Sequence, residues 1–268
     1  RDLARYVREL RRHGIAFNYL LNASCLGNRE WGRAWEKRLR RFLRRLWAMG
    51  VTRLTVSTPF LLERIKYAFP QFTLKVGIFA QVDTPERARF WEDLGADAIT
   101  LESFSINRDF PRLQAIREAV NCDLQLIANH LCLPNCPMQP YHQNGFAHGS
   151  DGSGGVFLDY CFLRCTQRRL AVPALFVKAA WIRPEDLHSY EAIGYDTFKL
   201  LERGIPSEAL ARRVEAYSAR HFEGNLAELL LSYGFRQPLR QSRLWAARHF
   251  FRPGQVWPWK LMPMLETV

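Results

Sequence analysis

The sequence predicts an α/β protein of the TIM-barrel type, in which parallel strands alternate with helices. Two observations lead to this fold class. Short apolar stretches alternate with amphipathic stretches along residues 1–220, which is typical of a parallel sheet. No G-x-G-x-x-G or G-x-x-x-x-G-K-[S/T] motif follows the first strand, which disfavours an open nucleotide-binding sheet. We expect seven strands in the chain and an eighth, the first of the barrel, before Arg1.

Each expected element has a local signature. The strands are expected at residues 15–22, 53–57, 72–79, 98–101, 124–128, 174–177 and 197–200. The helices are expected at residues 2–12, 30–49, 59–69, 84–95, 109–119, 184–192 and 207–219. Pro59 and Pro85 suit the first turn of a helix, and Gly50 and Gly95 suit the position just after one.

Residues 221–268 do not continue this alternation. A short helix is expected at 225–231, and the remainder mixes arginines with aromatic residues. The aromatic residues are Phe235, Trp245, Phe250, Phe251, Trp257 and Trp259. We therefore divide the chain into a barrel domain, residues 1–220, and a C-terminal extension, residues 221–268. The extension is expected to pack on the barrel, and docking of a partner is the alternative.

The chain has 268 residues and a net charge of +12. Such a charge favours nucleic acid, an anionic membrane surface or an acidic protein as a partner. No apolar run is long enough to span a membrane. The chain begins at Arg1 without a methionine, so we expect a fragment or a processed form. Its cysteines are expected to be reduced, which favours the cytoplasm.

Residues 126–169 contain four of the six cysteines, in two pairs. Three residues separate Cys132 from Cys136, and three separate Cys161 from Cys165. In a helix this spacing places both thiols on one face. Four thiolates are the ligand set of iron–sulfur clusters and of structural zinc, and the spacing does not choose between them. Disulfides are less favoured in a long chain without a signal peptide.

The segment between the two pairs is rich in glycine, serine and histidine and has no hydrophobic period. It is therefore expected to form a loop that the metal centre anchors. Cys122 lies at the start of a strand and is expected to be a core residue.

Polar residues stand where the expected strands end. The active sites of barrels form at this end of the sheet, so these residues are candidates for substrate binding. They are Asn22, Ser57, Gln81, Glu102, Asn129, His130, Lys178 and Lys199. Cys25 follows the first of these strands and is an alternative metal ligand.

The expected helix at 30–49 carries basic residues opposite its apolar stripe. They are Arg33, Lys37, Arg40, Arg41, Arg44 and Arg45. Such a row is a candidate phosphate track for RNA, and a simply solvated helix face is the alternative.

Two stretches resemble the peptidase U32, or collagenase-like, family. They are VSTPFLLERIKYAFPQFTLKVGIFAQVDTPERARFWEDLGADAITL, from residue 56, and WIRPEDLHSYEAIGYDTFKLLERGIPSEALARRVEAYSARHFEGNLAELL, from residue 181. The resemblance covers most of residues 15–230. It implies a 4Fe-4S cluster on Cys132, Cys136, Cys161 and Cys165. It also implies a part in oxygen-independent hydroxylation, either of tRNA or rRNA pyrimidines or of the ubiquinone ring, with a hetero-partner of the same family as one option.

This sequence departs from the family pattern in two places. Relatives often have a longer gap between their first two cysteines, so Cys25 is an alternative to Cys136. The sequence Asn129-His130-Leu131-Cys132 also replaces the family's HGALC-like approach to the first cysteine.

Two other functions remain open. A peptidase, as the family name says, needs a thiolate with a histidine base in reach, and Cys25 with His130 is the pair that the sequence offers. No H-E-x-x-H motif is present, which argues against a zinc protease of that type. A zinc-stabilised, non-catalytic module that binds RNA or protein is the third reading.

Overall fold

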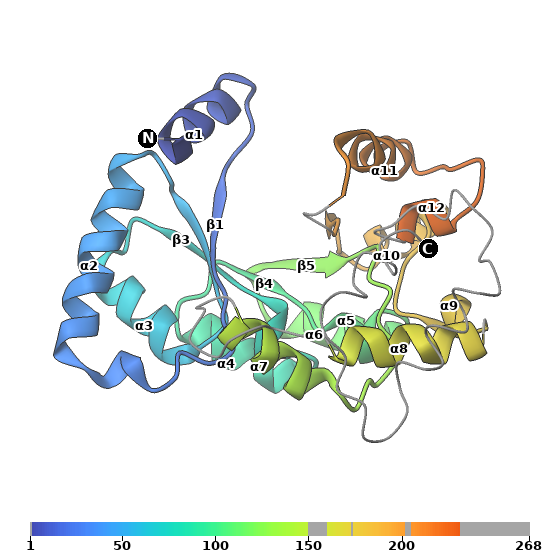
Figure 1. The fold of residues 1–268 in the computed structure, drawn as a ribbon, viewed down its shortest axis with the longest axis horizontal. Coiled ribbons are helices and arrows are strands. Elements are labelled where there is room, and N and C mark those ends of the chain that lie inside the picture. Colours follow the sequence, from blue (N-terminus) through green and yellow to red (C-terminus); the bar gives the residue numbers. More distant parts are fainter. Residues whose placement is uncertain (1, 150–159, 173, 202–204, 231–268) are drawn as a thin grey trace.

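The computed structural model describes residues 2–149, 160–172, 174–201 and 205–230. Its centre is a sheet of six parallel strands in sequential order, each paired with the next. The strands are β1 Asn18–Leu21, β2 Arg53–Val56, β3 Thr73–Val76, β4 Ala98–Thr100, β5 Asp123–Ile127 and β6 Thr197–Lys199. The sheet curls into a half-barrel flanked by helices (Figure 1), which confirms the predicted fold class.

The expected helices form close to their predicted bounds. They are α1 Asp2–Arg12, α2 Arg33–Ala48, α3 Pro59–Ala68, α4 Pro85–Asp93, α6 Phe110–Ala119, α10 Leu187–Glu191, α11 Ser207–Ala219 and α12 Ala227–Leu230. Proline begins α3 and α4 as expected. The side chains of Thr84 and Asp109 cap α4 and α6 by accepting a hydrogen bond from a backbone N–H three residues on. Short 3-10 turns, η1 Arg29–Trp31 and η3 Pro184–Asp186, precede α2 and α10.

The core lies between the sheet and these helices. Leu54, Val56, Leu74, Val76 and Ile99 of the strands are fully buried against the helices. Leu62 of α3, Ile116 of α6 and Trp91 of α4 pack into the same cluster. This packing fixes where each strand ends, and therefore also the positions of the residues that follow each strand.

The sixth predicted strand, residues 174–177, is wrong. The segment is a helix, α9 Ala174–Lys178, and Lys178 is exposed at its end. A run of four apolar residues does not distinguish a strand from a helix by periodicity. The next residues instead bind the segment that follows β5. The backbone N–H of Ala180 donates to the carbonyl of Cys132 at 3.1 Å, and that of Ile182 donates to Ala128 at 2.7 Å.

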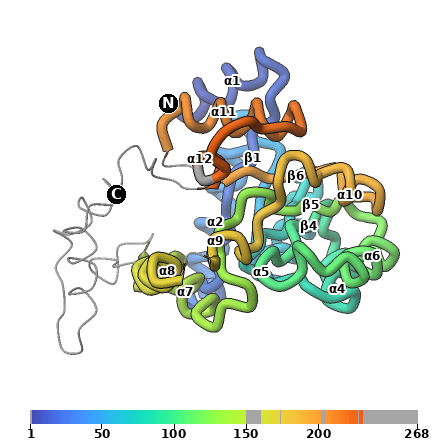
Figure 2. The backbone as a smooth tube through the Cα atoms, turned by 90° about the vertical axis from the view of Figure 1, so that its right-hand side faces the viewer, coloured from blue at the N-terminus to red at the C-terminus, as the bar shows by residue number. Residues whose placement is uncertain are grey.

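The predicted loop between the cysteine pairs is also wrong in part. Residues 139–149 form α7, Gln139–Gly149, and residues 160–171 form α8, Tyr160–Ala171. Two views show α7 next to α8, with α5 and α9 nearby (Figures 1 and 2). The buried residues of α7 are Gln143 and Ala147, one turn apart, so one of the two is polar. A search for apolar periodicity therefore misses this helix.

The predicted third strand is shorter than expected. β3 ends at Val76, and a 3-10 turn, η2 Ile78–Ala80, follows Gly77. Among the described residues, no helix combines the length and the apolar composition that a membrane crossing needs. The basic-aromatic part of the extension, residues 231–268, and the strand expected before Arg1 lie outside the described residues.

A candidate metal and substrate site at the strand ends

Glu102 follows β4 and caps the short helix α5, Ser103–Ile106. Its carboxylate accepts hydrogen bonds from the N–H of Phe104 at 2.8 Å, the N–H of Ser105 at 2.9 Å and the hydroxyl of Ser105 at 2.7 Å. The residue is 4% exposed. Burial raises the pKa of Glu102 above its ordinary value, although these hydrogen bonds act in the opposite direction. The strand end therefore holds an acid that keeps its proton at higher pH than an exposed carboxyl.

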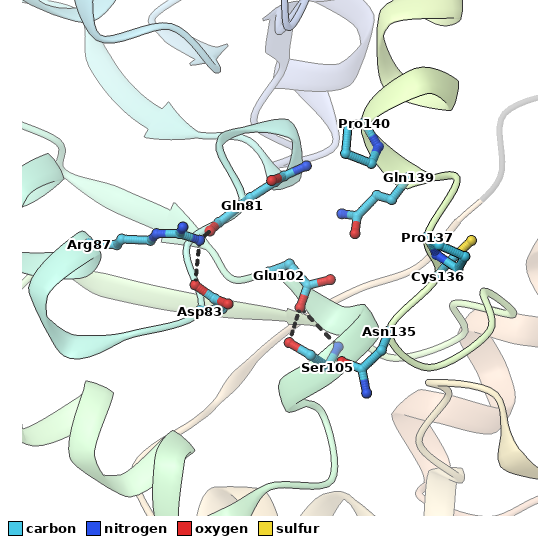
Figure 3. A pocket seen from close by; sticks show the side chains of 10 residues that line it. All are labelled: Gln81, Asp83, Arg87, Glu102, Ser105, Asn135, Cys136, Pro137, Gln139 and Pro140. Atoms are coloured by element: carbon cyan, nitrogen blue, oxygen red, sulfur yellow. Dashed lines mark hydrogen bonds and ion pairs between the residues drawn. The ribbon is translucent and has the colours of Figure 1, made fainter.

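A pocket of about 300 Å³ opens beside Glu102 (Figure 3). Its lining is polar, with two prolines at one edge. The lining residues are Gln81, Asp83, Arg87, Glu102, Ser105, Asn135, Cys136, Pro137, Gln139 and Pro140. Cys136 of the cysteine stretch and Gln81 of the predicted rim thus share one cavity.

Two pocket residues have a left-handed backbone. The φ angle of Gln81 is +53° and that of Asn135 is +50°. Such conformations are uncommon outside glycine, and they cluster at functional sites, where the surrounding structure maintains them. Arg87 supports the Gln81 turn, since it donates to the carbonyl of Gln81 at 2.9 Å and to the carboxylate of Asp83 at 2.7 Å.

His130 links the cysteine stretch to α5. Its Nδ1 lies 2.5 Å from the hydroxyl of Ser103, and its Nε2 lies 3.1 Å from the sulfur of Cys132. Burial lowers the pKa of His130 to about 3, and the positive charges of Lys199 and Arg169 act in the same direction. Burial raises the pKa of the Cys132 thiol, and the nearby thiol of Cys165 adds to the rise. Without a bound metal, this pair is a neutral imidazole and a neutral thiol.

Helix α8 provides the second cysteine pair. Cys161 and Cys165 lie one turn apart, and Arg169 lies one turn further on. Arg169 is 5% exposed. Its Nη1 donates to the sulfur of Cys165 at 3.3 Å, and its Nη2 donates to the carbonyl of Leu131. Arg169 therefore ties α8 to the segment that carries Cys132.

Three of the four predicted ligands lie near one another, as a shared thiolate centre requires. The thiols of Cys165 and Cys136 are both close enough to Cys132 to raise its pKa electrostatically. The Nε of Arg169 is buried without a hydrogen-bond partner, which suits an anionic group next to it. Within the described ranges, no three Cys, His, Asp or Glu side chains are placed to bind a single metal ion. A cluster spreads its thiolates over several irons and needs a wider arrangement than zinc does.

The other predicted rim residues have different surroundings. The amide of Asn129 donates to the carbonyls of Leu201 at 2.6 Å and Leu229 at 3.4 Å, and its oxygen accepts from the N–H of Leu201. Asn129 thus links the end of β5 to the segments of Leu201 and Leu229 and has a structural role. Ser57 is 6% exposed, and its hydroxyl has no hydrogen-bond partner.

Asn22 and Ser57 both border Gly77, at the start of the turn after β3. Cys25 lies in the loop after β1, where its sulfur accepts from the N–H of Gly27 at 3.3 Å. Lys199 contributes a positive charge near His130.

Most of the basic residues of α2 face solvent. The exposed residues of the predicted row are Arg33, Lys37, Arg41, Arg44 and Arg45, and Arg38 of the same helix is exposed as well. Arg40 is half-buried and pairs with Glu36 at 3.1 Å, and Arg64 of α3 binds the same carboxylate. Arg40 therefore joins a contact between α2 and α3.

Sequence reasoning missed several residues of the site. They are Asp83, Arg87, Ser103, Asn135, Gln139 and Arg169. Two of these residues could have been found from their spacing in the sequence. Arg87 is four residues after Asp83, a helical ion-pair spacing, and Arg169 continues the four-residue series of Cys161 and Cys165. The left-handed turn of Gln81 has no such signal, whereas asparagine, the residue at 135, adopts this conformation more often than most residues do.

Comparisons with known proteins place the chain in a family. No family model matches the sequence. The chain is 34% identical over 229 residues to the uncharacterized protease MJ1657 of Methanocaldococcus jannaschii, an alignment that covers 85% of this chain and 68% of that protein. Its fold is similar to that of the U32 peptidase Mk0906, with a TM-score of 0.57 and 24% identity over 76% of each chain. The chain belongs to the peptidase U32 family.

Proposed function

We propose that this chain holds a 4Fe-4S cluster on Cys132, Cys136, Cys161 and Cys165 and takes part in oxidative modification of a ring in the adjacent pocket. Oxygen-independent hydroxylation of an RNA base or a quinone-like ring is the reaction we favour. One observation carries the proposal. Cys132 and Cys165, from different pairs, lie together beside the buried guanidinium of Arg169. When bound, such a cluster supplies one-electron transfer.

The pocket suits a small, planar, polar ligand. The amides of Gln81, Asn135 and Gln139 offer donors and acceptors, and the two prolines offer apolar surface. Glu102 adds a buried carboxyl group to the pocket wall, and burial raises its pKa. Recognition by paired donors and acceptors would distinguish such a ring from a purely apolar one.

The exposed basic residues of α2 support RNA as the carrier of that ring. Each contact between a lysine or arginine and a phosphate releases counterions, so RNA binding should weaken steeply with salt. Replacing Arg41, Arg44 and Arg45 by Gln should lower RNA affinity and flatten the salt dependence. Replacing Arg89, Arg112 and Arg212 by Gln is the matched control, because it removes the same charge from other helices. Equal binding by both variants would favour a free quinone-like ring.

One observation favours a peptidase instead. His130 touches the sulfur of Cys132 at 3.1 Å, the geometry of a nucleophile and its base. The electrostatics oppose this function. Burial raises the pKa of Cys132 and lowers that of His130, so it works against the thiolate–imidazolium pair that a cysteine peptidase needs. Cleavage of a denatured protein substrate, lost in Cys132→Ala, would support the peptidase.

The decisive experiment is anaerobic purification with an absorption spectrum and analysis of iron, sulfide and zinc. We expect a brown protein with about four irons per chain. Cys161→Ser and Cys165→Ser should lose the colour, whereas Cys122→Ser, outside the site, should keep it. One equivalent of zinc without iron would contradict the cluster and support a zinc-stabilised binding module.

A further inference from the structure

We propose that His130 and Arg169 raise the electron affinity of the metal centre by donating hydrogen bonds to the sulfurs of Cys132 and Cys165. Ser103 acts with them as a positioning residue that holds the imidazole of His130 against the sulfur of Cys132. The inference rests on the proposed function, because it concerns the thiolates that would hold the cluster. It adds roles for three residues that are not themselves ligands.

The contacts of His130 make it a hydrogen-bond donor to sulfur when Cys132 is a thiolate. A metal-bound thiolate has no proton, so in the contact at 3.1 Å Nε2–H must be the donor. On the other side of the ring, Nδ1 lies 2.5 Å from the hydroxyl of Ser103, so the imidazole is held between Ser103 and Cys132. Ser103 is 1% exposed, so water does not compete for this contact. The ring of Phe104, centred 4.7 Å from the imidazole, holds its orientation.

Arg169 does the same for the second cysteine pair. Its side chain is always charged, and its Nη1 donates to the sulfur of Cys165 at 3.3 Å. The guanidinium lies over the ring of Phe176, at 6.0 Å from the centroid, and Nη2 is held by the carbonyl of Leu131. A fixed positive charge in a buried setting acts strongly on its neighbours, because little water screens it.

The direction of the effect follows from charge. Reduction adds one negative charge to the metal and its thiolates. Hydrogen bonds to sulfur and a nearby cation stabilise that added charge, so they favour the reduced form. One donor reaches one thiol of each cysteine pair, so both halves of the ligand set are affected.

The test compares Arg169 with its neighbour. Arg168, on the same helix, is exposed, so Arg168→Met removes the same charge without removing a sulfur contact. In the full chain purified anaerobically, the midpoint potential of the metal centre is measured by a redox titration followed by electron paramagnetic resonance. We expect Arg169→Met to favour the oxidised form about tenfold, a shift of about 59 mV to more negative potential for a one-electron couple. Arg169→Lys should shift less, and Arg168→Met least.

Ser103→Ala provides an independent reading. It leaves charge and packing almost unchanged but removes the contact that orients His130 toward Cys132, so the potential should move in the same negative direction by a smaller amount. Should Arg169→Met fail to hold a metal centre, the Ser103→Ala result decides. Equal potentials for Arg169→Met and Arg168→Met, or an unshifted Ser103→Ala, overturn this inference while the iron content upholds the proposed function. A wild-type chain without iron overturns both.

Discussion

Replacing Glu102 by Gln tests the buried acid at the pocket. The two oxygens of Glu102 divide three hydrogen bonds between them. One oxygen accepts from the N–H of Phe104, and the other accepts both the N–H and the hydroxyl of Ser105. A glutamine keeps one acceptor and turns an NH₂ group toward the remaining donor. At least one buried donor then loses its partner, which costs about 1–3 kcal/mol.

The difference between the two proteins should depend on pH. Burial raises the pKa of Glu102, so the native state binds this proton more tightly than the unfolded state does. The contribution of Glu102 to stability is then complete below its unfolded pKa, about 4.3, and is partly lost as pH rises through the folded pKa. Glutamine does not titrate. The difference in free energy of unfolding between wild type and Glu102→Gln should therefore be largest at low pH. As pH rises, it should decrease by about 1.4 kcal/mol for each unit by which burial raises the pKa of Glu102.

The assay is urea unfolding of both proteins between about pH 4 and pH 8, followed by circular dichroism. Glu118→Gln, on the exposed side of α6, is the reference for a carboxyl in solvent. A difference that increases as pH rises would refute the reasoning, since it would mean that the three hydrogen bonds outweigh burial and lower the pKa.

Three further perturbations probe the frame of the site. Burial, and to a smaller extent the charge of Glu92, raises the pKa of the Cys122 thiol to about 12, so about one thiol in ten thousand is ionised at pH 8. Iodoacetamide should therefore label Cys122 far more slowly in the native protein than in urea, as measured by mass spectrometry. A Cβ on Gly77 would lie 2.8 Å from the hydroxyl of Ser57, so Gly77→Ala should lower the free energy of unfolding by about 1–3 kcal/mol. Adding Ser57→Ala should recover part of this loss, and strict additivity of the two changes would argue against the clash. Arg213, 1% exposed, donates to the carbonyls of Leu201 and Glu228, so Arg213→Met should cost about 2–4 kcal/mol, and an unchanged unfolding midpoint would contradict this.

The strands and most helices were predictable because local chemistry and tertiary packing agree in them. Leu54 and Val56 of β2 are apolar and fully buried, and proline begins the helices where the pattern changes period. The prediction of a strand at 174–177 was wrong because a short apolar run suits a strand and a helix equally well. The backbone hydrogen bonds to Ala128 and Cys132 are made by the residues that follow this run.

The candidate site was predictable by residue type and only partly by position. The cysteine spacing singled out Cys132 and Cys165, and the rule for strand ends found Gln81 and Glu102, which share the pocket. The same rule also selected Asn129, whose amide is used within the fold. A sequence shows that a polar residue stands at a strand end, but its hydrogen-bond partners come from segments far along the chain. The metal and the reaction remain predictions.

The tie made by Asn129 has a consequence for the newly made chain. It joins Leu201 and Leu229, 72 and 100 residues further on. At about 5–20 residues per second, a ribosome adds those 100 residues in about 5–20 s. Throughout that interval the thiols of Cys132 and Cys136 lie on a nascent segment whose frame is incomplete. The surroundings of these two cysteines are thus completed only once Leu229 has been made.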